Sequence, residues 1–104
     1  MDKNKIRQIM LGQKLKELRE SKGFVQRQVA AILQVDTAYV SKIENNEKPV
    51  SRGHLKSLSN LYEIDEDELL TMWLANKIIQ LVDDEKNSIV ALQMALHKLS
   101  RNNK

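Results

Sequence analysis

The sequence predicts an all-α fold, and three observations support this prediction. The chain of 104 residues has only three glycines and one proline, so few positions favour a β-turn or interrupt a helix. Its β-branched residues are scattered and never alternate with polar residues over the length of a strand. Apolar residues instead recur mainly at intervals of three and four, which places them on one face of a helix. We therefore expect a single core formed by packed helices.

The N-terminal part of the chain divides into four expected helices. They span about residues 5–22, residues 26–33, residues 37–44 and a stretch that begins after Ser51, its expected cap. Gly23 follows the first helix as a residue that readily takes a positive φ. Asp36 is expected to cap the third helix with its side chain, and Asn46 to end it in the left-handed conformation.

Two further helices are expected in the C-terminal part. The acidic run at residues 65–68 has the pattern of a capping box, with carboxylates at the positive end of a helix. This helix is expected to continue or bend near residues 75–76, because no strong stop signal lies there. The acidic residues 83–85 are expected to cap a last helix. We therefore divide the chain into a domain at residues 1–74 and a helical extension at residues 75–104.

Charge is distributed unevenly along the chain. Residues 1–60 carry 12 Lys and Arg against 6 Asp and Glu, whereas residues 61–104 carry 5 against 8. The first part is therefore suited to facing a polyanion, and the second to another role such as pairing with a further chain. Ordinary surface variation is the alternative explanation of the same counts.

Several classes of protein are disfavoured. No cysteine is present, which excludes disulfides and thiolate metal sites. His54 and His97 lack a companion ligand at metal spacing, so we expect no metal and no cofactor. No phosphate loop, hydrolase motif or nucleophile–base pair occurs, which argues against an enzyme and against catalytic residues. With no apolar run long enough for a membrane span and no recognisable signal peptide, a cytoplasmic protein is expected.

The most informative local feature is a pair of short helices joined by a three-residue turn. Residues 26–33 and 37–44 are too short to be stable alone, so both depend on packing into a larger helical body. This arrangement is typical of a helix-turn-helix, in which the second helix enters the major groove of DNA. The exposed positions of the second helix fit that role in part, because Thr37 and Lys42 can donate hydrogen bonds and Ala38 can touch a thymine methyl.

The residue pattern around these helices resembles the Xre or Cro/C1-type helix-turn-helix family. The resemblance lies in residues 11–19 and 23–30, in residues 35–45, and in residues 58–65 followed by Leu69 and Leu70. It covers about residues 8–74. It implies a five-helix, lambda-repressor-like DNA-binding domain, to which the extension at 75–104 is added.

The resemblance also implies roles for individual residues. Base edges would be read by Thr37, Ala38 and Lys42. Phosphates would be contacted by Gln26 and Asn45. From their side chains and their places on or beside the two short helices, we also expect phosphate contacts from Arg27, Tyr39, Lys48 and Arg52. Arg19 and Glu44 would form a partly buried ion pair that holds the reading helix and does not itself read DNA. Two alternatives stay open: the ring of Tyr39 packs on the neighbouring helix, and Lys48 and Arg52 belong to a solvated face.

The chain departs from the family pattern at three positions. Gln34 stands in the turn where a glycine is common, so it must tolerate or alter the backbone required there. Val25 replaces the usual polar cap of the second helix, and Asn46 replaces the usual glycine after the third. Thr37 and Ala38 offer few hydrogen bonds, so we expect DNA shape to supplement base readout.

The resemblance to phage repressors and to controllers of restriction–modification operons implies a sequence-specific transcriptional regulator. We expect it to bind double-stranded DNA as a homodimer on a palindromic operator, with residues 75–104 packing on the domain and on the symmetry mate. An antitoxin, whose C-terminal helix binds a toxin protein and which autoregulates its operon, is the alternative. A helix-turn-helix scaffold for protein association alone is a third possibility, disfavoured by the basic first part.

Overall fold

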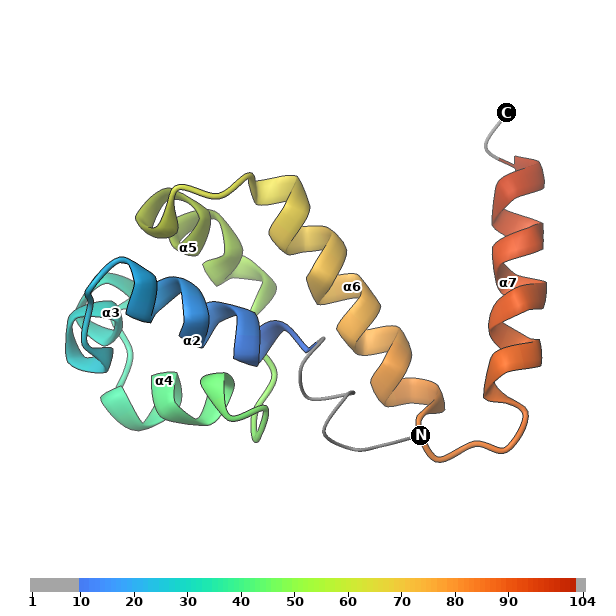
Figure 1. Ribbon diagram of the computed structural model, residues 1–104, viewed down its shortest axis with the longest axis horizontal. Helices are drawn as coiled ribbons and strands as arrows, with labels where there is room; N and C mark the ends of the chain where they lie inside the picture. The colour runs from blue at the N-terminus through green and yellow to red at the C-terminus, as the bar shows by residue number, and fades with distance from the viewer. Residues whose placement is uncertain (1–9, 103–104) are drawn as a thin grey trace.

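The computed structural model describes residues 10–102, and these residues form six α-helices and one short 3-10 helix (Figure 1). The elements are α2 (Leu11–Ser21), α3 (Gln26–Leu33), α4 (Thr37–Glu44), η1 (Arg52–His54), α5 (Leu55–Tyr62), α6 (Glu66–Val82) and α7 (Ser88–Asn102). The predicted all-α fold is confirmed, and the bounds of α3 and α4 agree with those expected. The predicted start of the first helix at Lys5 lies outside the described residues.

Helices α2 to α6 share one apolar core. It comprises Leu11, Leu15, Val29, Ala30, Leu33, Val40, Ile43, Val50, Leu55, Leu58, Tyr62 and Leu69. These residues recur at three- and four-residue intervals within their helices, which explains why the apolar spacing predicted the elements. Figure 1 shows α6 lying beside α5 and α2, and α7 standing apart from the body that α2 to α6 form. No described residue of α7 belongs to the core or to the partly buried residues packed against it.

Helix ends are set largely by residues in the left-handed conformation. Gly23 (φ 77°) and Asn46 (φ 61°) end α2 and α4 as predicted. At Asn46 the chain makes two reversed hydrogen bonds, from Asn46 N–H to the Ile43 carbonyl and from Glu47 N–H to the Lys42 carbonyl, the pattern of a Schellman motif. Gln34 has φ 59°, so it accepts the backbone that a glycine commonly supplies in this turn.

Several expected side-chain caps are not formed. Asp36 and Ser51 precede α4 and η1, but neither side chain accepts a capping hydrogen bond. The carbonyl of Asp36 still accepts from the N–H groups of Tyr39 and Val40, so the backbone alone starts α4. Asp65 does cap α6, since its Oδ1 accepts from Asp67 N–H at 2.8 Å. No reciprocal bond from the Glu68 side chain completes the expected capping box.

The acidic residues 83–85 do not cap the last helix, contrary to prediction. They lie in the connection between α6 and α7, and α7 begins only at Ser88, where Ala91 N–H donates to the Asn87 carbonyl. The chain changes direction between the two helices (Figure 1) and needs residues 83–87 to do so.

Helix α6 continues without interruption from Glu66 to Val82, and so runs across the proposed division between residues 74 and 75. Two of its side chains tie it to the body. Trp73 Nε1 donates to the Val50 carbonyl at 2.7 Å, and Asn76 Oδ1 accepts from Leu11 N–H at 3.1 Å. Among the described residues, no helix combines the length and the apolar character required to cross a membrane.

Candidate nucleic-acid interface

The helix-turn-helix consists of α3, the turn at residues 34–36, and α4. Val29 and Leu33 on α3 and Val40 and Ile43 on α4 are buried, and they hold the two short helices against the core. Because these residues occupy one side of each helix, the other side of α4 faces solvent. Thr37, Ala38 and Lys42, the expected base-reading residues, are all exposed there.

A buried carboxylate connects α4 to the two helices before it. Glu44, which is 3% exposed, accepts from Arg19 Nε at 2.8 Å and from Arg19 Nη2 at 3.1 Å. Its Oε1 also accepts from Gln26 Nε2 at 3.0 Å. Arg19 Nη1 donates to the Phe24 carbonyl at 2.9 Å, so the same guanidinium also holds the chain between α2 and α3. The hydrogen bonds that Arg19 donates to the Glu44 carboxylate raise the pKa of Arg19 further above its ordinary value.

This network gives Gln26 a role within the protein. Its amide nitrogen donates to Glu44, and its side chain is half-buried at the start of α3. Gln28 supports the same helix end, since its Oε1 accepts from Val25 N–H at 2.9 Å. The valine itself has no side-chain acceptor, so only one half of a capping box is present.

The C-terminal end of α4 is fixed by a close approach to α2. Asn46 Oδ1 accepts from Gly12 N–H at 3.2 Å. A Cβ atom on Gly12 would collide with the Ile43 carbonyl oxygen and with Asn46 Oδ1. Sequence reasoning did not identify Gly12 as a contact residue, because its place within an amphipathic helix does not reveal which backbone will approach it.

Tyr39 packs on the next element, in agreement with one of its two interpretations. Its hydroxyl accepts from Ser51 N–H at 3.2 Å and shares a hydrogen bond with His54 Nδ1 at 3.3 Å. The His54 ring meets the tyrosine ring edge-on, at 5.6 Å between centroids. Tyr39 therefore joins α4 to η1 and orders the loop between them.

Basic side chains surround this loop. Lys48 Nζ lies 5.5 Å from the centre of the Tyr39 ring, and Arg52 Cζ lies 5.5 Å from the centre of the Trp73 ring. Lys77 on α6, which was not among the predicted site residues, places Nζ 4.5 Å from the same Trp73 ring. All three cations are exposed, and the aromatic rings restrict where they lie without neutralising them.

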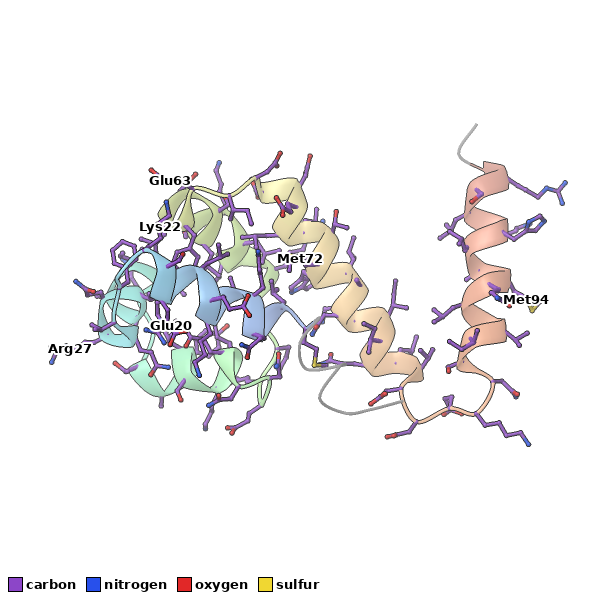
Figure 2. The ribbon with its side chains drawn as sticks, in the orientation of Figure 1. Glu20, Lys22, Arg27, Glu63, Met72 and Met94 are labelled. Carbon is purple, nitrogen blue, oxygen red and sulfur yellow. The ribbon has the colours of Figure 1, made fainter. Side chains whose placement is uncertain are left out.

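The remaining expected phosphate contacts, Arg27 and Asn45, are also exposed. Figure 2 shows Arg27 extending away from the body at the α3 side. Lys22, in contrast, forms an ion pair with Glu63 between the ends of α2 and α5, and this hydrogen bond lowers the pKa of the Glu63 carboxyl (Figure 2). Within residues 10–102, His, Cys, Asp and Glu side chains form no group of three or more that could hold a metal ion.

Comparison with protein families agrees with this geometry. The family model described as Helix-turn-helix, of the Cro/C1 type, matches residues 15–69, which is more than half of the 104-residue chain. The matched residues begin in α2, include all of α3, α4 and α5, and end in the first turn of α6. No match to a curated protein or to a solved structure accompanies it. The chain therefore belongs to the Cro/C1-type, Xre-like helix-turn-helix family of DNA-binding regulators.

Proposed function

We propose that this protein is a sequence-specific transcriptional regulator that binds a palindromic operator as a homodimer. One observation carries the proposal: α4 presents an exposed side to solvent while its buried side is fixed to α2 and α3 through Glu44. A helix held in this way can enter the major groove, which is about 12 Å wide, without losing its orientation.

Base readout is assigned to Thr37, Ala38 and Lys42. Ala38 and Lys42 are four residues apart on α4 and so share one side of the helix, next to Thr37. The lysine can donate to the acceptor edge of a guanine, the threonine hydroxyl to several bases, and the alanine methyl can contact thymine. Only one of the three has a long donor, so Lys42 carries most of the expected discrimination.

Phosphate binding is assigned to the residues on either side of α4. Gln26 and Arg27 lie at the start of α3, and Asn45, Lys48 and Arg52 follow α4. Contacts of this kind position the protein on the duplex and carry no sequence information. Tyr39 acts in this proposal by ordering the loop that carries Lys48 and Arg52, since its hydroxyl binds the Ser51 N–H.

A two-fold dimer follows from the size of α4. An eight-residue helix that enters the groove near one end contacts only a few base pairs. Two copies related by a two-fold axis read two half-sites about 34 Å apart, and the operator is then palindromic.

The experiment is selection of bound sites from random duplex DNA, followed by binding of Lys42→Ala to the selected site and to random DNA. We expect the variant to lose roughly five- to hundredfold in affinity for the selected site, and much less for random DNA. Lys22→Ala removes a cation that is paired with Glu63 and serves as the matched control. Equal losses on both DNAs would contradict base readout by Lys42.

A second candidate function, an antitoxin, is favoured by the exposed apolar residues of α7. In that case α7 would dock a toxin protein, and DNA binding would serve autoregulation. Co-expression with the product of the adjacent gene separates the two functions: a stable complex that is lost on deletion of α7 supports the antitoxin.

A further inference from the structure

Helix α7 has an apolar surface that nothing in the described chain covers. Ile89, Leu96 and Leu99 are 57%, 66% and 59% exposed. Figure 1 shows the helix standing apart from α2 to α6. A 15-residue helix is only marginally stable in water on its own, so its formation depends on a packing partner.

The arrangement of the apolar residues indicates what that partner is. Ile89, Leu92, Leu96 and Leu99 follow one another at intervals of three, four and three, which forms a single seam of the kind found in paired helices. The seam is symmetric about its centre near Met94. When a second α7 runs in the opposite direction, Ile89 lies opposite Leu99 of the second copy and Leu92 lies opposite its Leu96. Each seam residue of one helix then has an apolar counterpart in the other.

Charge selects the antiparallel direction. Asp83, Asp84 and Glu85 precede α7 and are exposed, and with the adjacent exposed Lys86 they leave this end net negative. Lys98 and Arg101 lie in the C-terminal half of α7 and are also exposed. A parallel pair would bring like charges together at both ends. An antiparallel pair brings the basic end of each helix towards the acidic end of the other, and it also opposes the two helix dipoles favourably.

We infer that α7 is the dimerisation element and that it pairs antiparallel with α7 of a second copy through the seam Ile89, Leu92, Leu96 and Leu99. This names the partner of α7 and deepens the proposed function, on which it rests for the role of the dimer in reading DNA. Exposed apolar residues on the preceding helix, Leu74, Ile78 and Leu81, extend the surface available to the paired copy.

The test uses two charge-reversed forms of the full chain. One form carries Lys98→Glu with Arg101→Glu, and the other carries Asp84→Lys with Glu85→Lys. Sedimentation in the absence of DNA and at low salt measures the dimer dissociation constant of each form alone and of their mixture. We expect each form alone to dimerise at least about tenfold more weakly than the natural chain, and the mixture to regain dimers, because every end contact in the mixed dimer is again between opposite charges.

Several outcomes would overturn the inference. A natural chain that sediments as a monomer would exclude α7 self-pairing, and this result is independent of DNA binding, which the Lys42→Ala experiment measures separately. Charge-reversed forms that dimerise as well as the natural chain would exclude the antiparallel direction, since a parallel pair keeps like charges together in each form. A mixture that stays monomeric would also exclude it. Lys16→Glu with Lys56→Glu makes the same change in net charge as the first form, but away from α7, and should leave dimerisation intact.

Discussion

Glu44 shows, at the scale of a single residue, how a buried charge can position a DNA-binding helix. Burial of a carboxylate is costly unless it is paired and hydrogen-bonded. Here Arg19 supplies two hydrogen bonds and Gln26 a third, so both carboxylate oxygens are satisfied. Among the described residues, no buried side-chain nitrogen or oxygen lacks a partner. The pair therefore specifies the position of α4 relative to α2 and α3 while adding little net stability.

Removal of one member of this pair should cost more than removal of both. We expect Arg19→Met alone, or Glu44→Leu alone, to lower the free energy of unfolding by about 3 kcal/mol, because each leaves the other charge without its partner. The double variant should lose clearly less than either single variant. Urea unfolding of the four proteins measures the comparison, and losses that simply add would contradict the coupling.

Tyr62 predicts a dependence of stability on pH in the alkaline range. Burial, and secondarily the nearby Glu44 charge, raise the pKa of Tyr62 to about 12, against a lowering effect of Arg19. The unfolded chain releases this proton near pH 10, whereas the folded protein keeps it until about pH 12. The folded state therefore binds more protons in this window. The tyrosine's contribution is fully present below pH 10 and is lost as the pH rises through 12, by up to about 2 kcal/mol.

Tyr62→Phe provides the measurement of this effect. The unfolding free energy of the natural chain minus that of the variant should be constant below pH 10 and should fall as the pH rises above 10. Lysine deprotonation affects both proteins alike, so it cancels in the difference. Direct titration of tyrosinate absorbance in a Tyr39→Phe background reports Tyr62 alone, and a midpoint near pH 10 would contradict the raised pKa.

At the scale of elements, the sequence predicted the helices themselves more accurately than the contacts that hold the helix ends. The bounds of α3 and α4 and the conformations of Gly23 and Asn46 could be predicted, because apolar spacing and residue type are local signals. The expected side-chain caps at Asp36 and Ser51 fail, since a capping rotamer competes with solvent in a way that residue type does not show. The start of α7 was placed too early because an acidic run occurs in a turn as readily as in a cap.

In the candidate site, too, some contacts could be predicted from the sequence and others could not. The pairing of Arg19 with Glu44 was implied by the family resemblance, whereas contacts between distant segments were not predicted at all. Leu11 and Asn76 are 65 positions apart, and Trp73 and Val50 are 23 positions apart. Helical periodicity shows which side of a helix is buried but not which segment buries it. Lys77 was missed for this reason, because its place near the loop after α4 depends on the packing of Trp73.

The close approach of α2 to α4 predicts that two glycine substitutions differ greatly in their effect on the free energy of unfolding. Gly12→Ala should lower the free energy of unfolding by about 1–3 kcal/mol, because the added methyl group collides with the Ile43 carbonyl oxygen and backbone must move. At Gly53 the nearest atom to an added Cβ is Ser51 Oγ at 3.8 Å, so Gly53→Ala is the matched control and should be neutral or slightly stabilising. Thermal unfolding measures the stabilities of the two variants. Equal stabilities would show that α2 and α4 do not meet closely at Gly12.

At the scale of the whole molecule, the chain combines a packed body with a helix that contributes nothing to its core. Helices α2 to α6 bury the apolar residues and carry the DNA-binding side, whereas the large apolar residues of α7 remain mostly exposed. If two copies associate through α7, this separation allows folding of the body and the proposed association to be measured independently.

If two copies associate through α7, α7 is stable as a helix only in the dimer, so the temperature at which α7 loses its helix should rise by a few degrees for each tenfold increase in protein concentration, whereas the melting temperature of the body should not. A chain ending at residue 82 should melt at a temperature independent of concentration, because it keeps every core residue but lacks α7. Leu96→Ser in the full chain keeps the length and should behave like the shortened chain. If the shortened chain retained the concentration dependence, the contact between copies would lie on the body, and the exposed stripe of α6 would be the next surface to test.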